Sequence, residues 1–526
     1  MWFVVYVLIQ PVGRKEFEER TFPYEFGYMV YKKDGKYYAK NGSTGNVEIV
    51  DVDAGRVIQY AINMSKNGGV VVFKPDTYYI NPQFTYHLHD NPWAVGLSTD
   101  GANNLIIDGN GARLVANSGT EIILYVLNTS NSVIRNLILD GNKNNQTWTY
   151  TDGKALLLTG GVRSGNVYEN ITVMNAWGDG IYIGNHNPDE YGDGDQPEYN
   201  AIIRNIRSQN NADVGQAGVV LDACINCIAE NIISYNDRVG LHISSPPNWP
   251  YPMVIKGVQI LDALYIGITN FYGNAELYNV AMYGSAPNYF DEAFIKFTYP
   301  DSRIKIDGLY INASNVALGN SVYSSAYLAV WTPVWMSGNP LTLIIKDAYV
   351  KVPTGNTYVG IYIENNVNAF IDSVKLVGQY GISVGGGTYK PSAIISNVEV
   401  SEISLNAFTT FNSTVYIYNV LSQKFKVYAK GDSLLVLDRP YPQLLYASDV
   451  AGLRFQRNSG VATISANSTS VTVSHMLVST PSKVLITPLA SPPGKLWVEN
   501  ITATSFDIAT DTAPTADLQV AWYAEV

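Results

Sequence analysis

The densest group of side chains that could do chemistry lies in residues 184–198, with the sequence GNHNPDEYGDGDQPE. Asp189, Glu190, Asp193 and Asp195 fall within seven residues, and His186 lies nearby. Carboxylate oxygens at this density can bind Ca²⁺, although their spacing does not match the EF-hand pattern. The sequence therefore leaves two interpretations, a calcium site and a solvated acidic loop.

Cys224 and Cys227 are the only cysteines and form a single C-x-x-C pair. One pair is too few for a zinc ribbon, and Ile228 stands where a c-type haem site would have histidine. We expect either two small core residues or one local disulfide.

Aromatic side chains form a third group. They could stack on sugar rings, build a subunit interface or pack under long loops. The clusters are Trp249, Tyr251, Tyr289, Phe290, Trp331 and Trp335.

Composition limits the classes of function. Only 15% of the 526 residues are charged and the net charge is −11, so no basic stripe is available to bind nucleic acid. Apolar residues make up 46%, enough for a large core, and no apolar run reaches the length of a membrane span. The 38 tyrosines and the sparse charge indicate a polar, weakly charged surface suited to an extracellular setting.

Residues 1–12 (MWFVVYVLIQPV) are apolar, but they lack the basic start and the cleavage site of a signal peptide. Their Val, Tyr and Ile content predicts a strand. That strand docks either on its own chain or on the open sheet edge of a neighbouring subunit.

A short unit consisting of a small polar residue, usually Asn, between two apolar strands repeats along the chain. Asn136, Asn170, Asn205 and Asn231 mark successive copies at intervals of 34, 35 and 26 residues. Such periods indicate a solenoid or a propeller, and the shorter intervals cannot hold a four-stranded blade. Asn tolerates left-handed backbone at corners and can stack as an amide ladder. The repeat therefore predicts a parallel β-helix with these four residues at stacked corners.

The sequence divides into four segments of an all-β protein. Residues 1–52 are expected to form a strand and a β-hairpin region. Residues 53–422 are expected to form the β-helix, with a capping helix at 53–65 that starts at Asp53. Residues 423–460 are expected to form a transition segment between the β-helix and the segment that follows. Period-2 strands at 461–526 predict a small β-sandwich. The side chains expected in its core are Val484, Ile486, Trp497, Phe506, Ile508 and Trp522.

Residues 53–422 resemble the pectin-lyase-like family of right-handed parallel β-helices. The resemblance rests on the helix at 53–65, the glycine-led strand Gly68-Gly69-Val70-Val71-Val72-Phe73, the turn Lys74-Pro75-Asp76-Thr77-Tyr78, and Gly178-Asp179-Gly180-Ile181-Tyr182-Ile183. The family includes polysaccharide lyases, glycoside hydrolases, phage tailspikes and surface proteins without activity. The resemblance therefore implies a right-handed fold and leaves the activity open.

The C-terminal segment resembles small β-sandwich modules similar to H-type lectin domains at the ends of viral fibre proteins. The residues that carry this are Val471-Thr472-Val473-Ser474-His475, Trp497-Val498-Glu499-Asn500 and Ala521-Trp522-Tyr523-Ala524. The tyrosine-rich, weakly charged composition also resembles surface proteins of thermophilic archaea and their viruses.

The resemblance implies where an active site would lie. The family's hydrolases place Asp residues on adjacent coils, because glycoside cleavage needs two carboxylates across one bond. Asp179 lies in the matching segment, Asp222 ends the equivalent strand one coil later, and His242 sits in Gly-Leu-His. The hydrolase set of Asn-x-Asp, Asp-Asp and Gly-His-Gly is missing, and so is the carboxylate-plus-base set of the lyases. Asp179 alternatively caps a turn, and we expect no catalytic residues.

Three hypotheses about function follow. The leading one is a non-enzymatic, structural or adhesive surface appendage: a viral fibre, spike or turret subunit, or an extracellular filament subunit. It would be a homo-oligomer, either a trimer or a helical filament, on a virion or outside a cell. No cofactor is expected beyond Ca²⁺ at the acidic loop, and the partner would be a glycan or receptor rather than nucleic acid. The alternatives are a polysaccharide lyase or glycoside hydrolase of the same fold, and a carbohydrate-binding adhesin.

Overall fold

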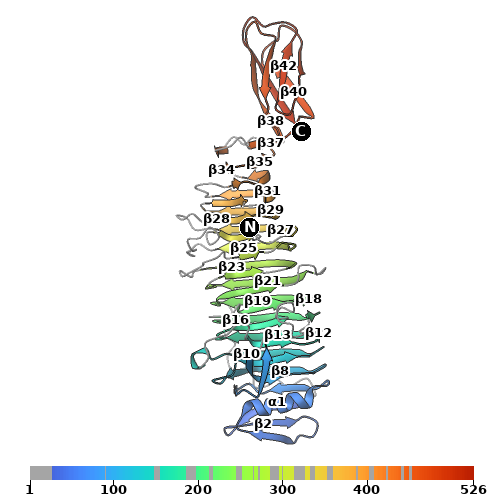
Figure 1. Ribbon diagram of the computed structural model, residues 1–526, viewed down its shortest axis with the longest axis vertical. Helices are drawn as coiled ribbons and strands as arrows, with labels where there is room; N and C mark the ends of the chain where they lie inside the picture. Colours follow the sequence, from blue (N-terminus) through green and yellow to red (C-terminus); the bar gives the residue numbers. More distant parts are fainter. Residues whose placement is uncertain are drawn as a thin grey trace.

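The repeat folds into a long rod of stacked coils with a small separate module at its C-terminal end (Figure 1). The computed structural model describes residues 27–526, apart from gaps. The gaps are 89–90, 147–154, 185–196, 213–216, 245–251, 265, 271–272, 285–294, 299, 313–325, 332–337, 352–358, 379, 387–388, 402–407, 422–424, 440–443 and 449–452. The strand expected in residues 1–12 lies outside the described residues.

One 19-stranded sheet forms two sides of the rod, because its long strands bend in the middle. From β8 onward each strand pairs in parallel with the strand one coil later. The strands are β1 (Tyr28–Lys33), β2 (Lys36–Asn41), β3 (Val47–Asp51), β4 (Val70–Phe73), β5 (Thr77–Ile80), β8 (Ile106–Ala116), β10 (Val133–Asp140), β13 (Val167–Met174), β16 (Ile202–Gln209), β19 (Ile228–Tyr235), β21 (Met253–Leu261), β23 (Ala275–Tyr283), β25 (Arg303–Asn312), β27 (Leu341–Lys351), β29 (Val367–Val377), β31 (Ser392–Ser401), β33 (Thr414–Leu421), β35 (Leu434–Leu437) and β37 (Leu453–Phe455).

A 15-stranded sheet closes the third side, and its strands from β7 onward are also parallel. They are β6 (Phe84–Leu88), β7 (Asn91–Ser98), β9 (Ile122–Leu127), β11 (Ala155–Gly160), β14 (Asp179–Gly184), β17 (Val219–Asp222), β20 (Val239–Ser244), β22 (Ile266–Asn270), β24 (Ile295–Thr298), β26 (Ala326–Trp331), β28 (Val359–Glu364), β30 (Tyr380–Gly385), β32 (Phe408–Phe411), β34 (Phe425–Lys430) and β36 (Leu444–Ser448). Three two-residue strands form a short parallel ladder at one corner: β12 (Arg163–Ser164), β15 (Glu198–Tyr199) and β18 (Cys224–Ile225). A 3₁₀ turn spans Lys143–Asn145.

The bends of the long strands fall at the repeated asparagines. Asn136, Asn170, Asn205 and Asn231 all have left-handed backbone, with φ between 53° and 57°. The side-chain amides of Asn170, Asn205 and Asn231 each donate to the side-chain carbonyl oxygen of the asparagine one coil earlier, at 3.0, 2.9 and 3.1 Å. The prediction of a stacked asparagine corner is confirmed, because the left-handed residue and the amide ladder both repeat with the coil.

The left-handed backbone at the corner predicts which substitution at Asn205 destabilises the protein more. Glycine keeps the left-handed backbone without strain and loses only the amide bonds, whereas alanine loses the same bonds and adds about 1–2 kcal/mol of backbone strain. We expect Asn205→Ala to lower the denaturation midpoint more than Asn205→Gly, as measured by guanidinium titration of matched samples. Equal midpoints for the two variants would show that the left-handed backbone is not what the asparagine provides.

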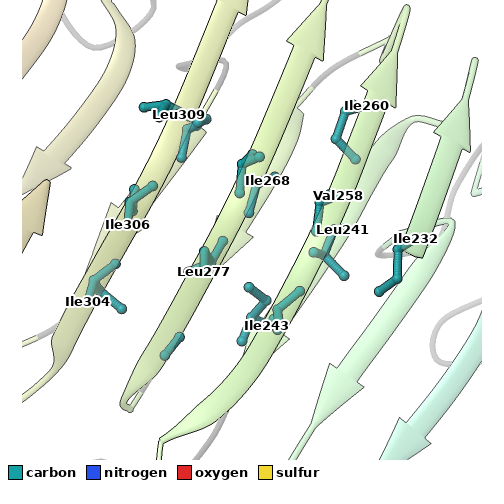
Figure 2. Packing of buried hydrophobic residues seen from close by; sticks show 14 of the residues in the cluster. Ile232, Leu241, Ile243, Val258, Ile260, Ile268, Leu277, Ile304, Ile306 and Leu309 are labelled. Carbon is teal, nitrogen blue, oxygen red and sulfur yellow. The ribbon is translucent and has the colours of Figure 1, made fainter. Parts of the chain in front are cut away.

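Aliphatic side chains from the two large sheets meet inside the coils. On β19, β21, β23 and β25 one interior row contains Ile232, Val258, Val280 and Leu309, which are stacked coil on coil. Leu241 and Ile243 of β20 approach them from the opposite sheet (Figure 2). Because every coil places the same kind of residue at the same height, the core is continuous along the rod.

The first coil is closed by helix α1 (Ala54–Ser65), which begins after the cap residue Asp53. The Asp53 side chain accepts a hydrogen bond from the Gly55 N–H at 2.8 Å. The apolar face of the helix, including Val57, Ile58 and Ile62, is buried. The capping helix and the hairpin of β1 and β2 thus end the rod as the sequence predicted.

The C-terminal module is a sandwich of two three-stranded antiparallel sheets, as predicted. One contains β38 (Arg457–Ile464), β43 (Leu518–Glu525) and β40 (Lys483–Pro488), and the other contains β39 (Ser470–Ser474), β42 (Ser505–Thr510) and β41 (Leu496–Glu499). Phe506, Ile508 and Trp522 are buried in the sandwich, and Val484 and Ile486 are partly buried against them. The expectation for Trp497 is wrong, because β41 places its side chain on the outer face, 40% exposed.

The junction between rod and sandwich also differs from the prediction of a transition at 423–460. Strands β34, β35, β36 and β37 continue both parallel ladders beyond residue 422. Main-chain hydrogen bonds from Phe455 to Met476 and from Val478 to Phe455, each 2.9 Å, then join the last coil to the sandwich. These coils were not predicted from the sequence, because the spacing of the repeat becomes less regular after Gln423.

Among the described residues, no helix has both the length and the apolar character needed to cross a membrane.

Candidate functional site

The structure separates the two carboxylates that the family resemblance singled out. Asp179 starts β14 and is buried, where its carboxylate accepts the Ala217 N–H at 2.6 Å. Asp222 ends β17, in register with Gly184 and Ser244 at the other end of the neighbouring strands. Five strand residues separate these two positions, about 16 Å. A hydrolytic carboxylate pair needs about 5–9.5 Å, so Asp179 and Asp222 do not form one.

Asp222 nevertheless has an unusual environment. It follows the interior residue Leu221, so its side chain faces away from the core. The Tyr182 hydroxyl donates to its carboxylate at 2.5 Å. Burial raises the pKa of Asp222 to about 7, and the hydrogen bonds from Tyr182 and Ser244 only partly offset that effect. A carboxyl group that titrates near neutrality can act as a general acid.

His242 lies in the middle of β20, between Val220 and Thr269 of the adjacent strands. It faces outward, as Tyr182 and Val220 do, but it is buried. Tyr182 and Val220 belong to a second apolar cluster, separate from the central core, that also contains Trp93, Tyr125 and Leu158. His242 is in register with Val220, two residues before Asp222 on the same outward face, as Tyr182 is on the other neighbouring strand.

Sequence reasoning missed a charged pair inside the rod. Arg163 and Glu198 both have fully buried side chains and form an ion pair with Nε and Oε2 3.0 Å apart. The Asn166 amide donates to the other Glu198 oxygen at 3.0 Å. Burial raises the pKa of Glu198 to about 7, although Arg163 opposes the shift.

A signal for this position was present in the repeat. Arg163, Glu198 and Cys224 each stand seven residues before a corner asparagine, Asn170, Asn205 or Asn231. The three strands that carry them pair directly, coil on coil. Aligning the repeats on the asparagines would therefore have shown that the three side chains stack at one interior corner.

Cys224 and Cys227 are free thiols, and both are buried. Burial, reinforced by a hydrogen bond with Cys227, holds the pKa of the Cys224 thiol above its usual value. Of the two alternatives from the sequence, the structure has two small core residues and no local disulfide.

The outer face of the β39–β42–β41 sheet combines an exposed indole ring with fixed polar groups. The Trp497 indole N–H donates to Glu499 at 2.7 Å. Asp507 accepts from the Thr472 hydroxyl at 2.6 Å and from the Asn500 amide at 2.8 Å, and these hydrogen bonds lower its pKa. We call Trp497, Glu499, Thr472, Asn500 and Asp507 the head face. An aromatic platform beside oriented carboxylates and amides can bind a polar ring by stacking and hydrogen bonding.

The acidic loop lies outside the described residues, so the calcium site at Asp189, Glu190, Asp193 and Asp195 stays a prediction. Among the residues that the structure does describe, no group of three His, Cys, Asp or Glu side chains could hold a metal ion. The side chains of the aromatic candidates Trp249, Tyr251, Tyr289, Phe290, Trp331 and Trp335 also lie outside that part of the chain.

A group of tyrosines on adjacent coils lies on one side of the rod. Tyr283 and Tyr310 lie on adjacent coils with ring centroids 5.5 Å apart, and Tyr310 stacks on Tyr349 at 5.0 Å. The planes of Tyr283 and Tyr310 are tilted by 43°, and those of Tyr310 and Tyr349 are nearly parallel at 10°.

The sequence matches no protein-family model and no curated protein. Solved structures are similar to it. A tailspike protein mutant of E. coli bacteriophage HK620 has a TM-score of 0.52 at 11% identity, covering 92% of this chain and 91% of that one. The tailspike protein gp49 from Pseudomonas phage LKA1 has a TM-score of 0.34 at 12% identity, covering 88% and 67%. The mannuronan C-5 epimerase AlgE6 A-module from Azotobacter vinelandii has a TM-score of 0.36 at 16% identity, covering 76% and 92%. The similarity to the HK620 tailspike, together with the strand pairing, shows that this chain has the right-handed parallel β-helix fold.

Proposed function

We propose that this protein is a structural and adhesive appendage at a virion or cell surface, in which the β-helix is a rigid shaft and the C-terminal sandwich binds a glycan. The observation that carries the proposal is the placement of the sandwich. It sits at the tip of a continuous rod, fixed there by main-chain hydrogen bonds, with the head face exposed.

The shaft suits this role because its hydrogen bonds run from coil to coil. Bending the rod would have to break backbone bonds in both large sheets and separate the stacked aliphatic rows. A head at the end of such a shaft is held away from the surface that anchors the other end. The fold shared with a bacteriophage tailspike is consistent with an appendage.

The head face suits a neutral or basic glycan, because its two carboxylates accept hydrogen bonds from hydroxyl groups while the indole ring packs on a sugar ring. Loss of the Trp497 ring should therefore weaken binding by about tenfold or more, or roughly 1.4 kcal/mol.

A glycan array probed with the full chain, followed by calorimetry on the best glycan, tests the head face. We expect Trp497→Ala to weaken binding about tenfold and Leu485→Ala to leave it unchanged. Leu485 is a matched control because it is 52% exposed on the opposite sheet of the same sandwich. Absence of binding to any glycan, or equal binding by both variants, would contradict a glycan-binding head.

A carbohydrate-active enzyme is the second candidate, and the raised pKa of Asp222 is the observation that favours it. Incubation with acidic and neutral polysaccharides would then release reducing ends or unsaturated products, and Asp222→Asn would abolish the release. We expect no products, because Asp179 lies at the other end of the adjacent strand and does not join Asp222 as a second carboxylate. Products that depend on Asp222 would replace the non-enzymatic proposal.

A further inference from the structure

An apolar row runs along the outside of the rod. On the first half of each bent strand, one outward-facing position is aliphatic or aromatic in nearly every coil, and strand pairing places these residues directly above one another. Phe370 is 46% exposed and Ile394 is 40% exposed. We call this row the flank stripe. Its lower part contains Ile106, Val133, Val167, Ile202, Ile228 and Val254. Its upper part contains Ile344, Phe370, Ile394 and Tyr416.

Strand propensity alone does not explain the flank stripe. The second half of the same strands has an equivalent outward row of mixed character. Six of its positions are polar or charged, namely Arg113, Thr172, Arg207, Gln259, Lys375 and Glu399, and six are aliphatic or aromatic, namely Ile138, Ile233, Ala281, Tyr310, Tyr349 and Leu421. Both rows lie on the same backbone ladder and face outward, yet only one is consistently apolar. An exposed apolar row of this length on a polar surface marks an interaction site.

A ladder of alternating charges borders the flank stripe. Arg135 pairs with Asp108 at 2.8 Å, Arg204 with Glu169 at 2.8 Å, and Lys256 with Glu230 at 3.5 Å. On each strand the charged residue comes two positions after the stripe residue, so its side chain points outward as well. Because they are paired within the chain, they form a polar rim beside the apolar row.

Two charged residues interrupt the flank stripe, and because they lie off its centre the two ends of the stripe are not equivalent. Between Val254 and Ile344 the row contains Glu276 and then Lys305, both of which bond to the Tyr278 hydroxyl, at 2.6 and 2.8 Å. A small pocket at this level is lined by Glu276, Arg303 and Lys305 together with Pro252, Asn274 and Ala275. The interruption lies off the centre of the row, with six apolar positions below it and four above.

We propose that the flank stripe is covered by the same stripe of a second copy of this chain, with the two rods parallel around a shared axis. A straight row with one residue per coil, repeating at about 4.8 Å, is matched along its whole length by a rod with the same repeat. This inference deepens the proposed appendage role by naming the assembly surface. Self-association and glycan binding are measured separately, so either can fail alone.

The interruption selects the parallel arrangement. In parallel rods Glu276 faces the same residue of the second copy, and so does Lys305, while each acid lies one coil from the bases of both copies. In antiparallel rods with full overlap, Glu276 would face Val254 and Lys305 would face Ile228, which would bury charge against aliphatic surface at a cost of several kcal/mol. The stripe with its borders, about 55 Å by 15 Å, offers about 800 Å² per copy, the size of a standard interface.

Analytical ultracentrifugation of the full chain tests the proposal. We expect an oligomer for the natural sequence and a dissociation constant at least about 100-fold weaker for the double variant Phe370→Lys/Ile394→Lys. The matched control, Tyr283→Lys/Tyr310→Lys, changes side chains that are 42% and 37% exposed on the other side of the rod, and it should assemble normally. Circular dichroism checks that both variants remain folded.

A crosslink tests the direction of the rods. Phe370→Cys should join to its own counterpart through a short bismaleimide, whereas Tyr283→Cys should not, and the native cysteines are buried. A monomeric natural protein, normal assembly of the Phe370→Lys/Ile394→Lys variant, or no crosslink at position 370 would each overturn the proposal. Association that appears only after residues 1–12 are deleted would show instead that the chain's own apolar start covers the stripe.

Discussion

Arg163→Ala is expected to destabilise the rod by about 3–5 kcal/mol, because it leaves the Glu198 carboxylate buried without its cationic partner. Arg163 also donates to the Gly184 carbonyl oxygen at 3.0 Å, so the substitution removes support from the adjacent sheet as well. The loss should be larger at pH 8 than at pH 5. At the lower pH Glu198, whose pKa is already raised to about 7, can become neutral.

Two variants separate this effect from the general cost of a substitution. Arg204→Ala removes one partner of a similar pair, Arg204 and Glu169 at 2.8 Å, on the surface of the rod, and it should cost no more than about 1 kcal/mol. Arg163→Met/Glu198→Leu removes both buried charges and should recover most of the stability that Arg163→Ala loses. Guanidinium midpoints at a fixed equilibration time compare the three. Equal losses for Arg163→Ala and Arg204→Ala would disprove the role given to burial.

The protein is expected to be more stable at pH 5 than at pH 7.5, the reverse of the usual acid sensitivity. Burial raises the pKa values of Glu198, Asp222 and Asp237 to about 7. Asp237 accepts from the Ser234 hydroxyl at 2.7 Å and from the Asn211 N–H at 2.8 Å, but these bonds do not offset its burial.

The sign follows from proton binding. Between the ordinary carboxyl pKa values and about 7, the folded state holds protons that the unfolded state has released. Stability is therefore full below the ordinary pKa values and falls as the pH rises to about 7, by a few kcal/mol in total. Carboxylates with lowered pKa values, such as Asp372 and Asp507, lose their contribution only at more acidic pH. These carboxylates therefore do not contribute to the change in stability between pH 5 and 7.5.

Denaturation midpoints across that pH range provide the measurement. Asp237→Asn should flatten the slope because its amide does not titrate, and Asp507→Asn on the exposed head face should leave the slope unchanged. Stability that rises from pH 5 to 7.5 in the natural sequence would mean that the three buried carboxyl groups are charged in the folded state.

The repeat in the sequence was enough to determine the coil. Asn136, Asn170, Asn205 and Asn231 identified the corners because few residues tolerate left-handed backbone, and a requirement of that kind is local. The capping helix after Asp53 and the sandwich strands were equally visible, since caps and period-2 patterns act over a few residues. The β-helix was predicted to end at residue 422, which is too early, because its last coils lack the repeated asparagine.

Only the tertiary structure decided which side chains meet. The spacing of Asp179 and Asp222 suggested neighbouring carboxylates, yet strand register placed them at opposite ends of adjacent strands, and register depends on where every coil turns. Trp497 reads as a core residue in an alternating strand, and the sandwich turned it outward to form the head face. The flank stripe is invisible along the chain because its members are 22 to 39 residues apart. Stacking the coils at one strand spacing is what makes them a continuous surface.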